Sequence, residues 1–234
     1  MKKLSKVKIV GFVLLIVLIA IGVFVGAKIL LKQRSLVLVK QVLISTEDKK
    51  IYEDRIQKRL EGIKTIALGD NLERGNYYLS IANDQMSLGL LGEAEKSIKE
   101  AIKLSPENPA FLQAYATILD QMNNSEDALG VIDKALTIRP QVLDYWNLKV
   151  TIMQHLDMDI KEIKSVYQEA IQKVDPTINA ITAYARYLES IGDTQGAIDQ
   201  WNAAITKNVD GKSMYQPEIT RLTSILTPQS PRTN

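Results

Sequence analysis

The chain has 234 residues, with 29 Lys and Arg against 27 Asp and Glu, one His and no Cys. The lack of cysteine excludes disulfide frameworks, thiolate metal sites and cysteine nucleophiles, and the lone His155 excludes a paired-histidine metal site. The formal net charge of +2 and the mean hydropathy of −0.05 are averages typical of a slightly basic soluble protein.

An uncharged apolar run lies near the N-terminus, from Ile9 to Ala27. Of its 19 residues, 14 are Leu, Ile, Val or Phe, and a helix of this length spans about 28 Å, close to the hydrocarbon thickness of a bilayer. A buried core helix would keep a polar face, which this run lacks. The sequence therefore predicts a transmembrane signal-anchor helix over residues 9–31, behind a basic tail over residues 1–8.

A cleaved signal peptide is the main alternative, because four lysines precede the run and Val25-Gly26-Ala27 resembles a cleavage site. The run is longer than a signal-peptide core of about 7–15 residues, and it resumes after Lys28, which favours an uncleaved anchor. The numbers of basic residues on the two sides of the span are equal, so they do not decide its orientation. Moving the lysine-rich tail across the membrane against an inside-negative potential would cost about 2.3 kcal/mol per charge per 100 mV. We therefore expect a single-pass cell-membrane protein with a cytoplasmic N-terminus and its C-terminal domain outside.

Two glycines, Gly22 and Gly26, form a small-xxx-small pair on one face of the predicted span. Such pairs let two membrane helices approach closely, so the pair would allow a homodimer to form through the anchor.

Residues 32–74 follow the span as a linker and a charged amphipathic helix. Apolar residues 36–39 and 42–44 either extend the membrane helix or pack under the domain that follows. Ser45-Thr46-Glu47-Asp48 has the pattern of a capping box, and a helix is expected after it. This helix either caps the following domain or forms a stalk above the membrane. Its apolar side chains recur at helical spacing: Ile51, Ile56, Leu60, Ile63 and Ala67.

The next region, residues 75–210, repeats itself with a period of about 34 residues. A shift of 34 superimposes Ala94 on Ala128, Ile98 on Ile132, Ala101 on Ala135, Leu104 on Ile138 and Pro106 on Pro140. Four units are expected, at about 75–108, 109–142, 143–177 and 178–211. Each unit has two helical segments separated by a short turn, for which we expect Leu91-Gly92-Glu93, Asn123-Asn124-Ser125 and Gly192-Asp193-Thr194.

These residues resemble the tetratricopeptide repeat family, in which small and large side chains at such positions let helical hairpins stack into a superhelix. The resemblance is weakest in the third unit, where Glu162 or Ile163 replaces the small residue that opens the second helix. It implies an all-α fold: an α-solenoid of about four hairpins with capping helices. A final helix within residues 212–226, near Pro217, would cover the last hairpin, and residues 227–234 are expected to be disordered.

Motifs that carry chemistry are missing from the sequence. Gly211-Lys212-Ser213 lacks the upstream glycine of a phosphate-binding loop, because residue 206 is threonine. His155 has no candidate nucleophile beside it and is interpreted as a surface or inter-repeat residue. We therefore expect no enzyme activity, no cofactor and no metal. Residues 1–34 carry seven basic and no acidic residues, which leaves 22 basic and 27 acidic residues, a net charge of −5, for the remainder. A nucleic-acid footprint is therefore absent.

In the family that the chain resembles, positions 2, 5, 9 and 12 of the first helices line a groove that binds ligand. The side chains at these positions are Ala110 and fifteen candidate groove residues: Asn76, Leu79, Asn83, Met86, Gln113, Thr117, Asp120, Asp144, Asn147, Thr151, Gln154, Asn179, Thr182, Arg186 and Glu189. The set is rich in amides and hydroxyls, which suit an extended peptide backbone. A carboxylate-binding lysine cradle is not reproduced, because Leu79 and Asp144 occupy lysine positions.

The sequence thus predicts a membrane-tethered protein-interaction module that recruits or organises proteins, or binds extended peptide segments, through this groove. The alternative is a structural, oligomerising subunit of a cell-envelope or secretion assembly.

Overall fold

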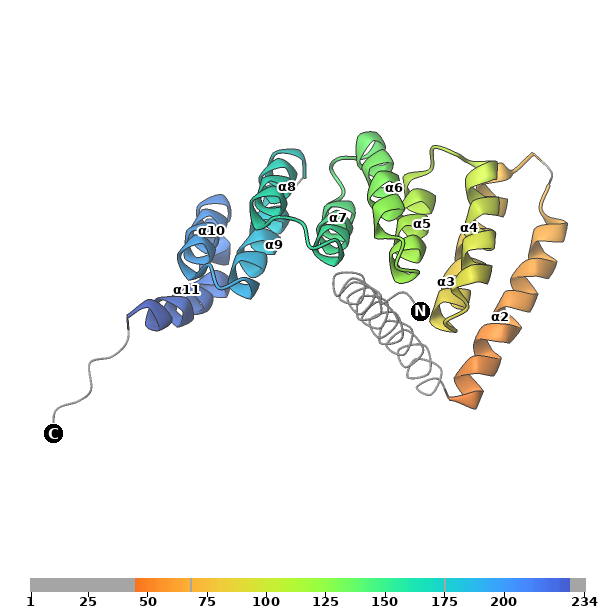
Figure 1. The fold of residues 1–234 in the computed structure, drawn as a ribbon, viewed down its shortest axis with the longest axis horizontal. Coiled ribbons are helices and arrows are strands. Elements are labelled where there is room, and N and C mark those ends of the chain that lie inside the picture. The colour runs from red at the N-terminus through yellow and green to blue at the C-terminus, as the bar shows by residue number, and fades with distance from the viewer. Residues whose placement is uncertain (1–44, 68, 175, 228–234) are drawn as a thin grey trace, which may run out of the picture.

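The computed structural model describes residues 45–67, 69–174 and 176–227 (Figure 1). The predicted basic tail, the membrane span with Gly22 and Gly26, the first part of the linker and nearly all of the C-terminal tail lie outside these residues. Within the described ranges, no helix has both the length and the apolar character needed to cross a membrane. The transmembrane prediction therefore stays a prediction.

The described chain is all-α, which confirms the expected fold class. It forms ten α-helices and one short 3-10 helix, Val209–Gly211. The α-helices are α2 Thr46–Thr65, α3 Asn71–Ser87, α4 Leu91–Leu104, α5 Pro109–Gln121, α6 Ser125–Ile138, α7 Leu143–His155, α8 Ile160–Lys173, α9 Thr177–Ser190, α10 Thr194–Lys207 and α11 Lys212–Leu226. From α3 to α10 they make four successive hairpins, α3–α4, α5–α6, α7–α8 and α9–α10.

The turn inside each hairpin places one residue at positive φ, at the same register in every hairpin. Gly89 and Gly192 occupy this position in the first and fourth hairpins, and Asn123 and Asp157 in the second and third. Glycine, asparagine and aspartate are the residues that adopt this conformation most readily. The prediction of the first turn at Leu91-Gly92-Glu93 was wrong. These residues form the start of α4, and the chain changes direction before them, at Gly89.

Alanines occupy the places where the two helices of a hairpin cross. Ala82 and Ala94 in the first hairpin, and Ala116 and Ala128 in the second, have no exposed surface. Successive first helices also contact one another, whereas successive second helices make no such contact over the described ranges. The first helices α3, α5, α7 and α9 therefore lie on the inner side of the curved stack.

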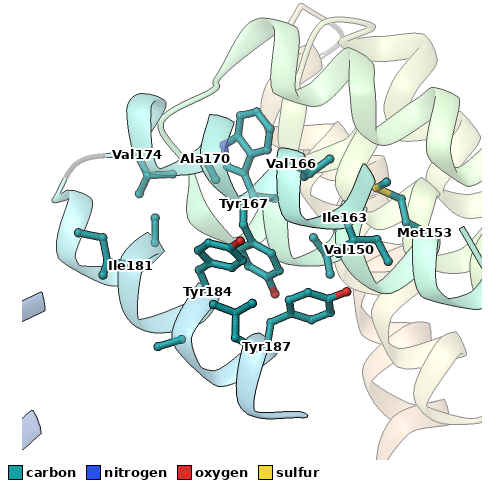
Figure 2. Packing of buried hydrophobic residues seen from close by; sticks show 14 of the residues in the cluster. Val150, Met153, Ile163, Val166, Tyr167, Ala170, Val174, Ile181, Tyr184 and Tyr187 are labelled. Atoms are coloured by element: carbon teal, nitrogen blue, oxygen red, sulfur yellow. The ribbon is translucent and has the colours of Figure 1, made fainter. Parts of the chain in front are cut away.

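The third hairpin is more open than the others. Its two crossing positions hold Val150 and Ile163 in place of alanines, and α7 and α8 contact each other less than the helices of the other hairpins do. Aromatic rings join α8 to α9: Tyr167 lies 5.1 Å, between ring centroids, from both Tyr184 and Tyr187 (Figure 2). Burial, and then the neighbouring Tyr187, raise the pKa of Tyr167 to about 12.

An ion pair between Lys164 and Asp193 also links α8 to the last hairpin. The Nζ of Lys164 lies 2.6 Å from a carboxylate oxygen of Asp193, and Asp193 caps α10 by accepting the backbone N–H of Gly196. The hydrogen bond from Lys164, and then that from Gly196, lower the pKa of Asp193. The pKa of such a carboxylate is lower in the folded chain than in the unfolded chain. It therefore stabilises the fold at pH values above the unfolded pKa, and this stabilisation is lost as the pH falls through the folded pKa.

We therefore expect Asp193→Ala to lower the free energy of unfolding by about 1 kcal/mol at pH 7, and by less at pH 3. Asp193→Asn keeps a capping side chain and removes only the ion pair, so its expected loss is smaller, about 0.2–1 kcal/mol. Urea unfolding of the three chains at both pH values measures these differences. An equal loss for Asp193→Ala at pH 3 and pH 7 would contradict the assignment.

The two ends of the stack are covered by α2 and α11. The N-terminal helix α2 packs on α3 through Ile63, and the C-terminal helix α11 packs on α10, with the rings of Trp201 and Tyr215 stacked at 5.8 Å between centroids. Pro217 lies inside α11, which begins five residues before it, at Lys212.

Candidate protein-binding groove

The candidate groove residues lie on the first helices, which form the inner side of the stack. None of the fifteen is buried. The exposed side chains are Asn76, Asn83, Asp144, Thr151, Gln154, Asn179 and Arg186. The half-buried side chains are Leu79, Met86, Gln113, Thr117, Asp120, Asn147, Thr182 and Glu189. Each of the fifteen side chains is therefore at least partly exposed to solvent.

Amide side chains are the main hydrogen-bonding groups of this inner face. Six of them make no side-chain hydrogen bond to any described residue, and they occur on all four first helices: Asn76, Asn83, Gln113, Asn147, Gln154 and Asn179. An amide offers both a donor and an acceptor, which is the combination that an extended peptide backbone requires. The amides can therefore pair with a peptide without first breaking a bond to the described part of the chain.

The threonines of the set offer a ligand fewer hydrogen-bond donors than the sequence suggested. The hydroxyls of Thr117 and Thr151 each donate at 3.0 Å to the backbone carbonyl four residues earlier, and that of Thr182 donates to the carbonyl of Asn179. Their protons are used inside their own helices. A bound ligand would meet them chiefly as methyl groups and acceptors.

Asp120 is engaged by a neighbouring hairpin. His155 Nδ1 lies 2.8 Å from one of its carboxylate oxygens, and Ser125 donates to the other at 2.7 Å. This contact bridges α5 and α7, so His155 is both a surface and an inter-repeat residue. The sequence did not reveal the pair, because 35 residues separate the partners.

Beside this pair is a polar cleft of about 650 Å³, named here the turn cleft. It is lined by Asp120, Gln121, Asn123, Asn124, Ser125, Glu126, His155 and Leu156.

Glu189, at the other end of the inner face, is held by the capping helix. Arg221 of α11 pairs with its carboxylate, and the indole N–H of Trp201 donates to the same group at 2.8 Å. These residues, with Arg186, border a cleft of about 270 Å³. The helix α11 therefore borders the inner face at its C-terminal end, and Arg186 is the candidate groove cation there that forms no ion pair with a described residue.

Sequence reasoning also missed Asp84, a charged residue in the core. Its side chain is 3% exposed and is neutralised by Arg55 and Arg59 of α2. Its position in the repeat could have revealed it, because the equivalent residues of the later hairpins are all buried: Ile118, Ile152 and Tyr187. A carboxylate at an apolar register position indicates a partner from outside the repeats. Burial, and then Arg55, lower the pKa of Arg59.

Catalytic or metal chemistry finds little support in the described residues. Within them, no group of three or more His, Asp and Glu side chains could hold a metal ion. The one Ser–Asp–His contact is not a nucleophile triad, because Ser125 donates to the carboxylate rather than to the imidazole. The arrangement positions His155 and activates no hydroxyl.

Comparison with known proteins agrees with this architecture. Residues 85–152 match the model of the tetratricopeptide repeat family. No curated protein sequence matches the chain significantly. The crystal structure of MamA is similar with a TM-score of 0.51 and 15% identity, covering 72% of this chain and 98% of that one.

Two further solved structures have the same fold. A thermophilic TPR protein of Thermus thermophilus has a TM-score of 0.50 and 15% identity, covering 80% of this chain and 98% of that one. The pilF protein of Pseudomonas aeruginosa has a TM-score of 0.51 and 14% identity, covering 67% and 70%. At such identities the likeness concerns the fold alone. The described chain is thus a tetratricopeptide-like helical solenoid, and its residues 85–152 carry the sequence pattern of that family.

Proposed function

We propose that this protein is a membrane-tethered, non-enzymatic interaction module that recruits or organises other proteins through its inner groove. Tetratricopeptide folds are generally non-catalytic scaffolds for protein interaction. The observation that carries the proposal is the row of six amide side chains on the inner face. They are accessible, they make no side-chain hydrogen bond to a described residue, and they run through all four hairpins.

The ligand that this surface fits is an extended polypeptide segment. Amides on consecutive first helices, about 8–10 Å apart, can pair with peptide groups about three residues apart in an extended segment. Leu79 and Met86 offer an apolar contact at the N-terminal end. Residues 35–234 carry a net charge of −5, which disfavours nucleic acid as the ligand.

The tether is proposed from the uncharged run over residues 9–27. A tethered groove meets its partners at a raised effective concentration, so that a modest affinity is sufficient for recruitment. We place the N-terminus in the cytoplasm and the solenoid outside, for the reason of charge translocation given above. Protease added to intact cells would then digest the solenoid, and protection of the solenoid where the outer surface is intact would overturn this orientation.

Groove binding is tested by substituting three accessible inner side chains, Asn83, Asn147 and Arg186, each by alanine. We expect the triple variant to lose the partners captured by the unaltered chain, with nearly unchanged thermal stability, because Asn83 and Arg186 are exposed and the half-buried Asn147 makes no side-chain hydrogen bond to a described residue. The matched control substitutes exposed residues of second helices, Lys96, Lys134 and Glu169, and should retain the partners. If the groove variant keeps its partners, or assembles only with itself in fixed stoichiometry, the structural-subunit alternative replaces groove recruitment.

A further inference from the structure

One edge of the solenoid is strongly acidic. We call it the turn edge and define it by residues 86–93, 120–127, 154–162 and 189–195, which hold the turn inside each hairpin and the helix ends beside it. Nine carboxylates lie there against one lysine, Lys161. The asymmetry has a physical cause: the second helices begin at this edge, and acidic residues favour helix N-termini. Figure 1 shows these turns at the lower side of the stack.

Six of the nine carboxylates remain available for a partner. Asp120, Glu189 and Asp193 pair with His155, Arg221 and Lys164. The other six are exposed and form no ion pair with a described residue: Glu93, Glu126, Asp127, Asp157, Asp159 and Glu162. No Lys or Arg occurs between residues 104 and 133, so the negative potential is strongest around the second hairpin.

Apolar side chains lie exposed among these carboxylates. Leu90 is 40% exposed, Met122 39% and Ile160 52%. Leu90 and Met122 lie in the turns of the first and second hairpins, and Ile160 begins the second helix of the third. An edge that combines carboxylates with apolar side chains is complementary to a segment that is both basic and apolar.

The helix α2 brings such a segment to this edge. Arg55 pairs with Asp84, and from that level α3 continues for three residues, about 5 Å, toward the turn edge. In the same direction α2 extends by nine residues, Thr46–Asp54, or about 14 Å. Its N-terminal end thus projects past the first turn, with Ile51 48% exposed (Figure 1). The chain that precedes Ser45 therefore leaves the described structure beside the turn edge.

The composition of that chain matches the edge. Residues 32–44 contain Lys32, Arg34 and Lys40, no acidic residue, and seven apolar residues. We propose that residues 32–44 lie along the turn edge of the same molecule. Their apolar side chains cover Leu90 and Met122, and their basic side chains face Glu93, Glu126 and Asp157.

The turn cleft supplies a specific receptor within this surface. Its walls contain no Lys or Arg and include the exposed Glu126, which forms no ion pair with a described residue, and its volume of about 650 Å³ can hold a guanidinium group. Arg34 lies eleven positions before Ser45, and an extended chain of that length spans up to about 36–40 Å. In the proposed arrangement Arg34 therefore extends from the end of α2 along the turn edge and pairs bidentately with the carboxylate of Glu126.

Docking of this kind fixes how the solenoid is held. A flexible linker would let the groove point in any direction, whereas a docked linker holds the turn edge toward whatever precedes residue 32. The inference does not rest on groove binding, and the two can fail separately.

The absence of cysteine permits a direct test by disulfide trapping in the full chain. Val39→Cys is combined with Met122→Cys on the turn edge, or with Ile138→Cys on the opposite edge. The latter is a matched control, because the two native side chains are 39% and 41% exposed. Under mild oxidation at high dilution, we expect the intramolecular disulfide of the 39/122 pair to form at least tenfold faster than that of the 39/138 pair. Equal rates, or no disulfide in either pair, would overturn the proposal.

A second measurement tests the charge complementarity. In the 39/122 background, Glu93→Lys with Glu126→Lys should slow disulfide formation severalfold at low salt. The opposite-edge control, Glu107→Lys with Asp210→Lys, should leave the rate unchanged. One further result would reject the proposed occupant. Disulfides that form only between molecules would identify a second copy of the chain on the turn edge.

Discussion

Replacing Arg55 and Arg59 together by methionine is expected to detach α2 from the solenoid, with a loss of about 3–5 kcal/mol of local stability. The reason is Asp84, whose carboxylate is 3% exposed and is neutralised by these two arginines. Without them it would remain as an uncompensated charge in the core. The chain would avoid this state by releasing α2 and letting water reach Asp84.

Amide hydrogen exchange over residues 46–65 measures this effect, because a solenoid loses stability next to the altered contact rather than uniformly. We expect α2 to exchange far faster in the double variant, while α7–α10 keep their protection. Lys50→Met with Lys58→Met, on exposed positions of the same helix, is the control and should change little. Adding Asp84→Ile should restore protection, since the equivalent buried residues of the next two hairpins are Ile118 and Ile152. Failure of that rescue would contradict the assignment.

This helix illustrates what the sequence could and could not predict. The capping box at Ser45 and the helix after it follow from local chemistry, and the Ser45 hydroxyl accepts the Asp48 N–H at 3.0 Å as expected. The partner of α2 does not follow, because Arg55 and Asp84 are 29 residues apart and meet only once the first hairpin has folded. The hairpins could be predicted from the repeat period, because each hairpin forms through contacts within one repeat of about 34 residues.

The groove shows the same division between local and long-range information. Position within the repeat predicted which side chains lie on the first helices, and all fifteen are accessible. It did not predict that Asp120 and Glu189 are engaged by His155 and Arg221, which come from other structural units. Nor did it find Gly89 as the reversing residue, because the choice between Gly89 and Gly92 depends on the backbone conformation at each position.

Phe111→Ala is expected to have the other large effect, a loss of about 3–5 kcal/mol at the junction of the first two hairpins. The ring has no exposed surface, and it is the largest side chain of a cluster that also contains Ala82, Ala94 and Ile98. Gly75 shows how closely it is enclosed: a Cβ built on that glycine would lie 2.7 Å from the ring. Alanine would leave a cavity that neighbouring helices, already at close approach, cannot fill.

The position of the two tryptophans makes this loss measurable as a separation of two transitions. Trp146 and Trp201 both lie in the later hairpins, so their fluorescence reports on those hairpins, whereas far-UV circular dichroism reports on every helix. In Phe111→Ala we expect the dichroism to begin falling at a lower urea concentration than the fluorescence, because α2–α4 uncouple first. Tyr115→Ala, a half-buried ring on the same helix, should give less than half the effect. Coincident transitions in Phe111→Ala would mean that the whole stack unfolds as one unit, and would also reject the local response expected for α2.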